Sequence, residues 1–150
     1  MIDLIWHLRG STPVAADLDS GAITERIERL LKNQRKDVTE KSDGSISFYT
    51  PLWSSMFGPN WKAMVIYDRG RFWLEGSASD RRLRYDLRSL HGFVYCLCGA
   101  AFFFVFTVFG NGLLFALGVA ALAFSWLYGM NMLLAWARVP LVIRKATRKP

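Results

Sequence analysis

Residues 92–137 form the longest apolar stretch of the chain and contain no Lys, Arg, Asp or Glu. A helix over residues 92–109 would be roughly 27 Å long, about the thickness of the hydrocarbon core of a bilayer. Residues 112–137 can form a second, longer helix, and the Gly-Asn-Gly at 110–112 leaves only a short turn between the two. The pattern therefore predicts two adjacent, antiparallel helices that cross a membrane.

Before residue 90 the pattern changes between the period of a strand and that of a helix. Residues 2–9 alternate apolar and polar side chains, which predicts a strand that ends at Gly10. A helix follows, with Asp19 or Ser20 as its N-cap and its end at 33–35. The apolar stripe of this helix consists of Ile23, Ile27, Leu30 and Leu31.

The segments that follow have the alternation and turn residues of strands. Asp43-Gly44 predicts a tight turn between strands at 38–42 and 45–50, with Ile46 and Phe48 facing the core. Residues 62–67 are apolar on both faces and predict a central strand, which turns at 68–70 into a strand at 71–75. Residues 82–88 alternate again and predict a last strand that runs toward the hairpin.

These elements predict an α+β fold, in which one helix packs on an antiparallel sheet of about five or six strands and a two-helix transmembrane hairpin follows. We expect residues 1–90 to form a cytoplasmic domain and residues 91–138 the hairpin. Residues 139–150 are expected to be a basic cytoplasmic tail.

Charge gives the predicted hairpin an orientation. Residues 1–90 hold fourteen Lys and Arg against twelve Asp and Glu, a net charge of +2, and residues 91–150 hold five Lys and Arg and no acid, a net charge of +5. The turn at 110–112 has no charge, so the positive-inside rule predicts that both termini are cytoplasmic in a bacterial-type inner membrane. The cations expected to contact anionic lipid headgroups at that surface are Arg82, Arg84, Arg88, Arg138, Arg144 and Lys145.

Small residues recur along both predicted spans at spacings of three and four. They are Gly92, Cys96 and Ala100 in the first span and Gly118, Ala121, Ser125 and Gly129 in the second. Small residues let helix backbones approach closely in lipid, so we expect the two stripes to face each other. The alternative is that one stripe faces a second subunit. Asn131 is expected to make a helix contact or hydrogen bond within the hairpin, in preference to forming a transport site.

Residues 51–61 are too long for a turn and too aromatic for an ordinary solvated loop. In one interpretation, Trp53, Phe57 and Trp61 close one end of the core. In the other, Trp53, Met56 and Phe57 enter the membrane interface or contact a partner, because tryptophan favours places where one edge is apolar and the other wet.

No motif indicates catalysis, a metal site or a cofactor. Cys96 and Cys98 would point to nearly opposite sides of a helix, so one metal could not easily bind both. His7 and His91 lie far apart in the sequence, and no spacing brings either beside a nucleophile. The arginines at 82–88 lie close to the predicted bilayer, which favours lipid headgroups over nucleic acid as their partner.

The sequence thus predicts a non-enzymatic, two-pass membrane protein. We expect it to be an accessory, assembly or interaction subunit, with a membrane protein or a second copy of the chain as its partner. The alternatives are an immunity-type protein, a hairpin that perturbs membranes, and, less favoured, an enzyme that acts on lipids.

Overall fold

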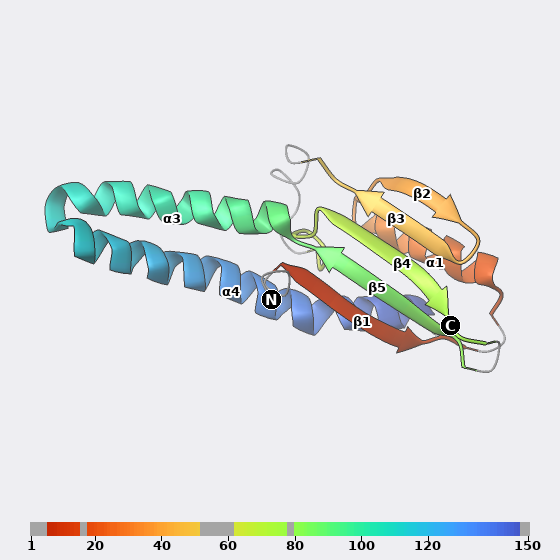
Figure 1. Cartoon of the computed structure of the whole chain (residues 1–150). Coiled ribbons are helices and arrows are strands. Elements are labelled where there is room, and N and C mark those ends of the chain that lie inside the picture. The colour runs from red at the N-terminus through yellow and green to blue at the C-terminus, as the bar shows by residue number, and fades with distance from the viewer. Residues whose placement is uncertain (1–5, 16–17, 52–61, 78–79, 148–150) are drawn as a thin grey trace.

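The computed structural model describes residues 6–15, 18–51, 62–77 and 80–147. One antiparallel sheet with the strand order β1-β5-β4-β3-β2 is followed by two long helices that pack side by side (Figure 1). The fold class is α+β, as the sequence predicts. The elements are β1 (His7–Pro13), α1 (Ser20–Asn33), β2 (Val38–Ser42), β3 (Ser45–Tyr49), β4 (Arg69–Glu75), β5 (Arg82–Arg88), α3 (Leu90–Asn111) and α4 (Leu113–Thr147).

Helix α1 forms where the apolar stripe predicts it. Its N-cap is Asp19, whose carboxylate accepts a hydrogen bond from the Gly21 amide at 3.3 Å. Ile27 and Leu31 are fully buried against the sheet, and Glu28 pairs with Lys32 one turn later at 2.7 Å. Both the amphipathic pattern and the capping residue are therefore confirmed.

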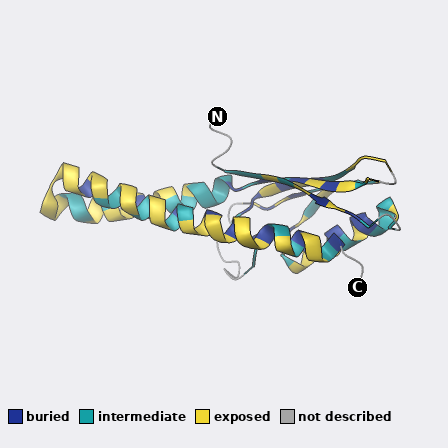
Figure 2. Cartoon of the chain, turned by 90° about the horizontal axis from the view of Figure 1, so that it is seen from below, coloured by how far each residue is buried: buried dark blue, intermediate teal, exposed yellow. Residues whose placement is uncertain are grey.

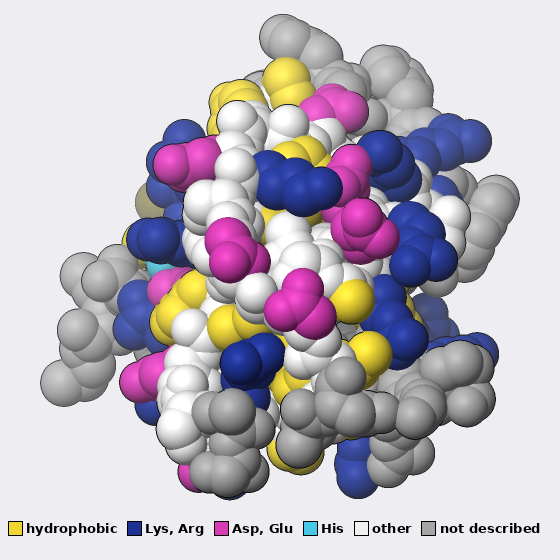
Figure 3. Space-filling view, turned by 90° about the vertical axis from the view of Figure 1, so that its right-hand side faces the viewer, with side chains coloured by type: hydrophobic (Ala, Val, Ile, Leu, Met, Phe, Trp, Pro, Cys, Tyr) yellow, Lys and Arg dark blue, Asp and Glu magenta, His cyan; other side chains and the backbone are white. Residues whose placement is uncertain are grey.

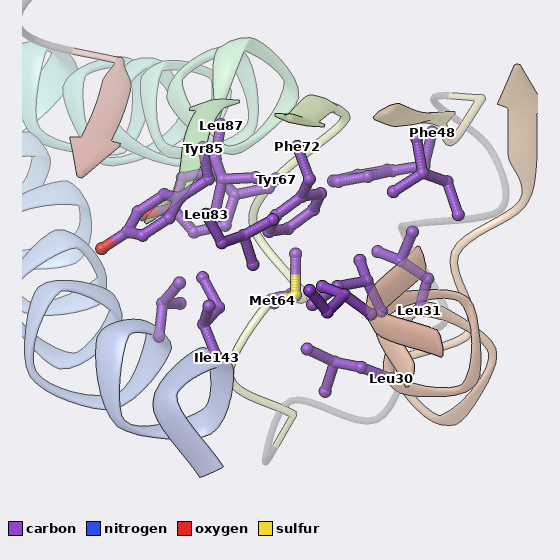
Figure 4. Packing of buried hydrophobic residues seen from close by; sticks show 14 of the residues in the cluster. Leu30, Leu31, Phe48, Met64, Tyr67, Phe72, Leu83, Tyr85, Leu87 and Ile143 are labelled. Atoms are coloured by element: carbon purple, nitrogen blue, oxygen red, sulfur yellow. The ribbon is translucent and has the colours of Figure 1, made fainter. Parts of the chain in front are cut away.

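A single face of the sheet carries the core of the domain (Figures 2 and 4). Helix α1 covers part of this face, and the last turns of α4 cover another part. Residues Ala135, Val139 and Ile143 of α4 recur every four positions and belong to the same buried cluster as the sheet residues. The prediction of one helix on the sheet was thus incomplete.

Helix α4 does not end near residue 137, where the predicted span ends. It continues through Pro140 to Thr147, so residues 139–147 of the predicted basic tail are helical. The extension has one buried face, because Val139 and Ile143 are fully buried while Arg144 and Lys145 are exposed. Burial of this apolar stripe against the sheet outweighs the interruption by a proline.

Strand β1 continues past Gly10, which was predicted to end it. Gly10 pairs with Tyr85 across the sheet, and a Cβ atom on Gly10 would lie 2.2 Å from the Tyr85 hydroxyl oxygen. The glycine therefore makes room for the Tyr85 ring over the strand and is no turn signal here.

The prediction of a central strand at 62–67 is wrong. This segment forms successive turns, with hydrogen bonds from the Val65 amide to the Lys62 carbonyl and from the Tyr67 amide to the Met64 carbonyl, both 3.2 Å. Met64 and Tyr67 are fully buried, so the apolar run fills the space beneath the sheet. Strand β3 pairs directly with β4, and five strands result.

Helices α3 and α4 are both long and apolar enough to cross a membrane. Their most apolar 18-residue windows are only 6% and 11% buried within the chain, unlike the core helix of a soluble protein. The outward surface is bulky, with Phe106 68% exposed, Phe109 87% and Leu114 86%. Figure 2 shows this exposed surface along the whole projecting hairpin.

Candidate functional site

The second face of the sheet, which we call the open face, is covered by no described helix (Figure 2). Because Leu83, Tyr85 and Leu87 are buried, the residues between them in β5 point to the open face. The same alternation holds in β1 and β4. Strands β1, β4 and β5 therefore place six arginines, Arg9, Arg69, Arg71, Arg82, Arg84 and Arg88, on the open face beside the two acids Glu75 and Asp86.

The two acids that β4 and β5 place on the open face are already paired. The Asp86 carboxylate lies 2.7 Å from His7 Nδ1 through one oxygen and accepts a hydrogen bond from Arg9 Nε at 2.8 Å through the other. Glu75 forms an ion pair with Arg84. These pairs neutralise part of the positive charge and leave the remainder on β4.

A groove of about 910 Å³ crosses the open face and is lined by residues of all five strands. This volume lies within the range of small-molecule sites. Arg69 lies over the Tyr49 ring, 5.3 Å from its centroid. Arg71 has no ion-pair partner among the described residues. The polar and aromatic lining includes His7, Ser47, Tyr49, Trp73 and Asp86.

Arg88, at the end of β5, connects the groove to the junction with the hairpin. Its guanidinium donates to the Asp68 carboxylate at 3.0 Å, and the second carboxylate oxygen accepts from the His91 amide at 3.3 Å. Asp68 is fully buried. It therefore places negative charge at the N-terminus of α3, where the helix dipole favours an anion.

The junction itself is held by hydrogen bonds between distant segments. The buried Ser89 hydroxyl forms a hydrogen bond with the Tyr128 hydroxyl of α4, with 3.1 Å between the two oxygens. The Ser89 amide donates to the Trp6 carbonyl at 2.7 Å. Phe93 of α3 packs edge-on against Tyr128, with ring centroids 5.4 Å apart. The start of β1, the end of β5 and both long helices thus meet at one place.

The cations that were predicted to contact lipid headgroups do not lie at one level of the structure. Arg88 lies one residue before the junction, whereas Arg82 begins β5 and is roughly 20 Å farther along the strand. Arg144 and Lys145 lie in the last turns of α4, roughly 18–20 Å beyond Met132, which contacts Ser89. Arg84 lies between the ends of β5, and Arg138 is exposed on α4.

Figure 3 views the end of the molecule away from the hairpin. Lysine and arginine side chains there alternate with aspartate and glutamate side chains, so this end has no single-sign patch. Ion pairs among the exposed side chains of the domain include Arg82 with Asp80, at 3.6 Å, and Lys41 with Glu28, at 2.7 Å. Two arginines without an ion pair among the described residues, Arg69 and Arg71, lie in the groove instead.

The predicted seam between the small-residue stripes is wrong on the α4 side. Gly118, Ala121 and Ser125 are exposed, and a Cβ atom on Gly118 or Gly129 would meet no described atom within 4 Å. The buried residues of the seam include Ala100, as predicted, and Ala116.

The remaining members of the predicted seam lie elsewhere. Gly92 packs against Ile66 of the turn segment, and Cys96 is half-buried. Asn131 is exposed and donates to the Leu127 carbonyl of its own helix at 2.7 Å. The alternative in which the outward stripe of α4 meets a second subunit remains a prediction.

The aromatic-loop residues Trp53, Met56, Phe57 and Trp61 lie outside the described residues. Sequence reasoning missed Arg69 and Arg71, because the first was assigned to a turn. The alternation of Arg69, Arg71, Trp73 and Glu75 with Gly70, Phe72 and Leu74 was the signal that could have found them.

Within the described residues, no three His, Cys, Asp or Glu side chains lie close enough to hold a metal ion. The arrangement on the open face is suited to binding an anion, because guanidinium groups form charge-assisted hydrogen bonds with carboxylates and phosphates. Comparison of the chain with protein-family models, with curated proteins and with solved structures gave no match.

Proposed function

We propose that this chain is a non-enzymatic, two-pass membrane protein that serves as an interaction subunit of a membrane complex. In this proposal, α3 and the first part of α4 cross the bilayer, and the sheet presents its open face to a partner. The observation that carries the proposal is the continuity of α4, whose first part packs on α3 and whose last turns complete the core of the sheet.

Two properties of the hairpin support the membrane location. Its outward surface consists of large apolar side chains that water would solvate poorly, with Phe106, Phe109 and Leu114 among the most exposed. All 19 Lys and Arg of the chain lie outside residues 92–137. The positive-inside rule then favours a cytoplasmic sheet and a turn at 110–112 on the opposite side.

A rigid connection supports a binding role for the sheet. The sheet is attached to the hairpin through Ser89 and, a second time, through the core residues of α4. The open face is therefore held in a fixed orientation to the hairpin. A surface that binds a membrane-embedded partner needs such a fixed orientation.

Site-specific photocrosslinking in the native membrane tests this function. A photoreactive side chain at Ser11, which is exposed and opposite Arg84 in the sheet, samples the open face without removing an arginine. The same side chain at Arg29, on the exposed surface of α1, is the control. We expect a crosslinked membrane protein, or a second copy of the chain, from Ser11 and none from Arg29.

Purification in mild detergent is the measurement that could contradict the proposed role. A particle that contains one 17.1 kDa chain and its micelle, together with no crosslink from Ser11, would contradict the proposed role. Orientation is tested separately with Asn111→Cys, whose thiol should react with an impermeant reagent added outside the cell. Reaction only after lysis would reverse the topology.

A further inference from the structure

The charges of the groove are unequally compensated. Arg88 donates to Asp68, and Asp86 uses one oxygen for His7 and the other for Arg9. Asp86 lies directly opposite Arg71 in the register of β4 and β5, but it is bound by His7 and Arg9, and neither Arg69 nor Arg71 forms an ion pair with a carboxylate of the described residues. Arg69 lies over the Tyr49 ring, and Arg71 lines the same groove.

Arg69 and Arg71 are placed so that one ligand can reach both. They are two residues apart in β4, so their Cα atoms are roughly 7 Å apart and both side chains leave the same face. Ser47 lies opposite Arg71 in the neighbouring strand and offers a hydroxyl group in the same groove.

The sheet tolerates an unfavourable pair at this point. Arg69 lies directly opposite Arg88 in the register of β4 and β5, and like charges in such positions destabilise a sheet. Departures of this kind from local stability rules occur at functional sites. Asp68 compensates part of this repulsion through its ion pair with Arg88, and an anion bound beside Arg69 would remove the remainder.

We propose that Arg69 and Arg71 form the centre of a phosphate-binding site in the groove. A phosphate monoester or diphosphate fits this site better than a carboxylate does. It carries up to about two negative charges and three acceptor oxygens, enough for two guanidinium forks at once. A carboxylate has one charge and only two acceptor oxygens.

The groove lies beside the junction with the hairpin, so two sources of phosphate are compatible with it. Arg69 and Arg88 form the row nearest to Ser89, which precedes α3. A lipid phosphomonoester reaches this row from the bilayer surface, and a soluble phosphate compound reaches it from water. The proposal does not rest on the function proposed above, because binding is measured on the purified chain alone.

Isothermal titration of the full chain in phosphatidylcholine nanodiscs, with inorganic pyrophosphate as the probe, tests the site. We expect saturable binding that weakens with added salt and at least about a tenfold loss of affinity in Arg69→Met and in Arg71→Met. Arg84→Met removes an open-face arginine that is paired with Glu75, and Arg29→Met removes one from α1. Both control variants should bind pyrophosphate as the wild type does.

A second arm distinguishes the lipid source. Native mass spectrometry of the chain from nanodiscs that also contain phosphatidic acid counts the bound lipid in the wild type and in the double variant Arg69→Met/Arg71→Met. Phosphatidic acid bound by the wild type and lost in the double variant identifies the headgroup as a ligand. Thermal melting shows that each variant is folded, as expected for two exposed side chains.

Two outcomes would overturn the proposal. One is that neither pyrophosphate nor phosphatidic acid binds, or that they bind equally well to the variants. The other is that a glutamate-rich peptide binds more tightly than pyrophosphate, which would make the groove a site for an acidic protein segment.

Discussion

Lys36 is a buried cation that should give the stability of this protein an unusual dependence on pH. It is 5% exposed, and its ammonium donates to the Tyr67 carbonyl at 2.6 Å beneath the sheet. Burial lowers the pKa of Lys36 from 10.5 to about 8, although Asp68 and Asp37 favour the charged form. The lysine therefore releases its proton at a lower pH in the folded chain than in the unfolded chain.

The sign of the effect follows from proton binding. Between pH 8 and pH 10.5 the unfolded chain holds a proton on Lys36 that the folded chain has lost, so the free energy of unfolding rises with pH. At 1.36 kcal/mol per pKa unit the full rise is about 3 kcal/mol. About 2 kcal/mol of this rise is reached by pH 9.5, which corresponds to an increase in melting temperature of about 4–8 °C.

Above pH 10 the trend should reverse. Burial raises the pKa values of Tyr67 and Tyr85, so the unfolded chain ionises at these tyrosines first and is favoured by a further rise in pH. The measurement is therefore confined to pH 7–9.5, where Lys36 dominates.

Thermal unfolding in one mild detergent, at several pH values, is the assay. The wild type should melt at a higher temperature at pH 9.5 than at pH 7, and Lys36→Met should lose this rise. Lys41→Met is the matched control, because Glu28 raises the pKa of Lys41 and its removal cannot abolish the effect. Equal melting temperatures at pH 7 and pH 9.5 in the wild type, or the same rise in Lys36→Met, would refute the reasoning.

Three further predictions concern packing and use the same melting assay. Gly70→Ala should lower the free energy of unfolding by about 1–3 kcal/mol, because the added Cβ would lie 2.3 Å from a Phe48 ring atom and 2.5 Å from a Leu87 methyl carbon, both fully buried; unchanged melting would mean that the sheet opens there without strain. Ala116→Leu should destabilise the hairpin by a similar amount, about 1–3 kcal/mol, because Ala116 is fully buried in the seam. Gly118→Leu should leave a monomeric hairpin unchanged, since Gly118 faces outward, and a fall in stability accompanied by loss of a dimer would show that a second subunit occupies this stripe.

Local patterns predicted those elements whose side chains obey one period and whose ends carry strong turn or cap residues. The turn at Asp43-Gly44, the strand β5 and the stripe of α1 are of this kind. The segment 62–67 is different, because a short apolar run has no period that tells a buried strand from buried turns. Only the tertiary position of Met64 and Tyr67 under the sheet distinguishes buried turns from a buried strand in this segment.

The hairpin shows a second limit of sequence reasoning. Helix α4 has two stripes of small or apolar residues with spacings of three and four, one through Ala116, Ala120 and Ala123 and the other through Gly118 and Ala121. Both stripes have the spacing of a helix seam, but only the first faces α3 and is buried or half-buried. The arginines of β5 were found from the sequence, but their assembly with Arg69 and Arg71 depends on a pairing of β4 with β5 that no local pattern specifies.

The contribution of α4 to the core of the sheet has a consequence for biosynthesis. Val139 and Ile143 fill positions beneath the strands, so the domain that begins near the N-terminus lacks part of its hydrophobic core until the ribosome has synthesised residue 143. Strand β1 likewise cannot pair until β5, its neighbour in the sheet, has been synthesised. Synthesis of the whole hairpin therefore precedes completion of the domain, and a nascent chain stalled before residue 139 should expose the underside of its sheet to chaperones and proteases.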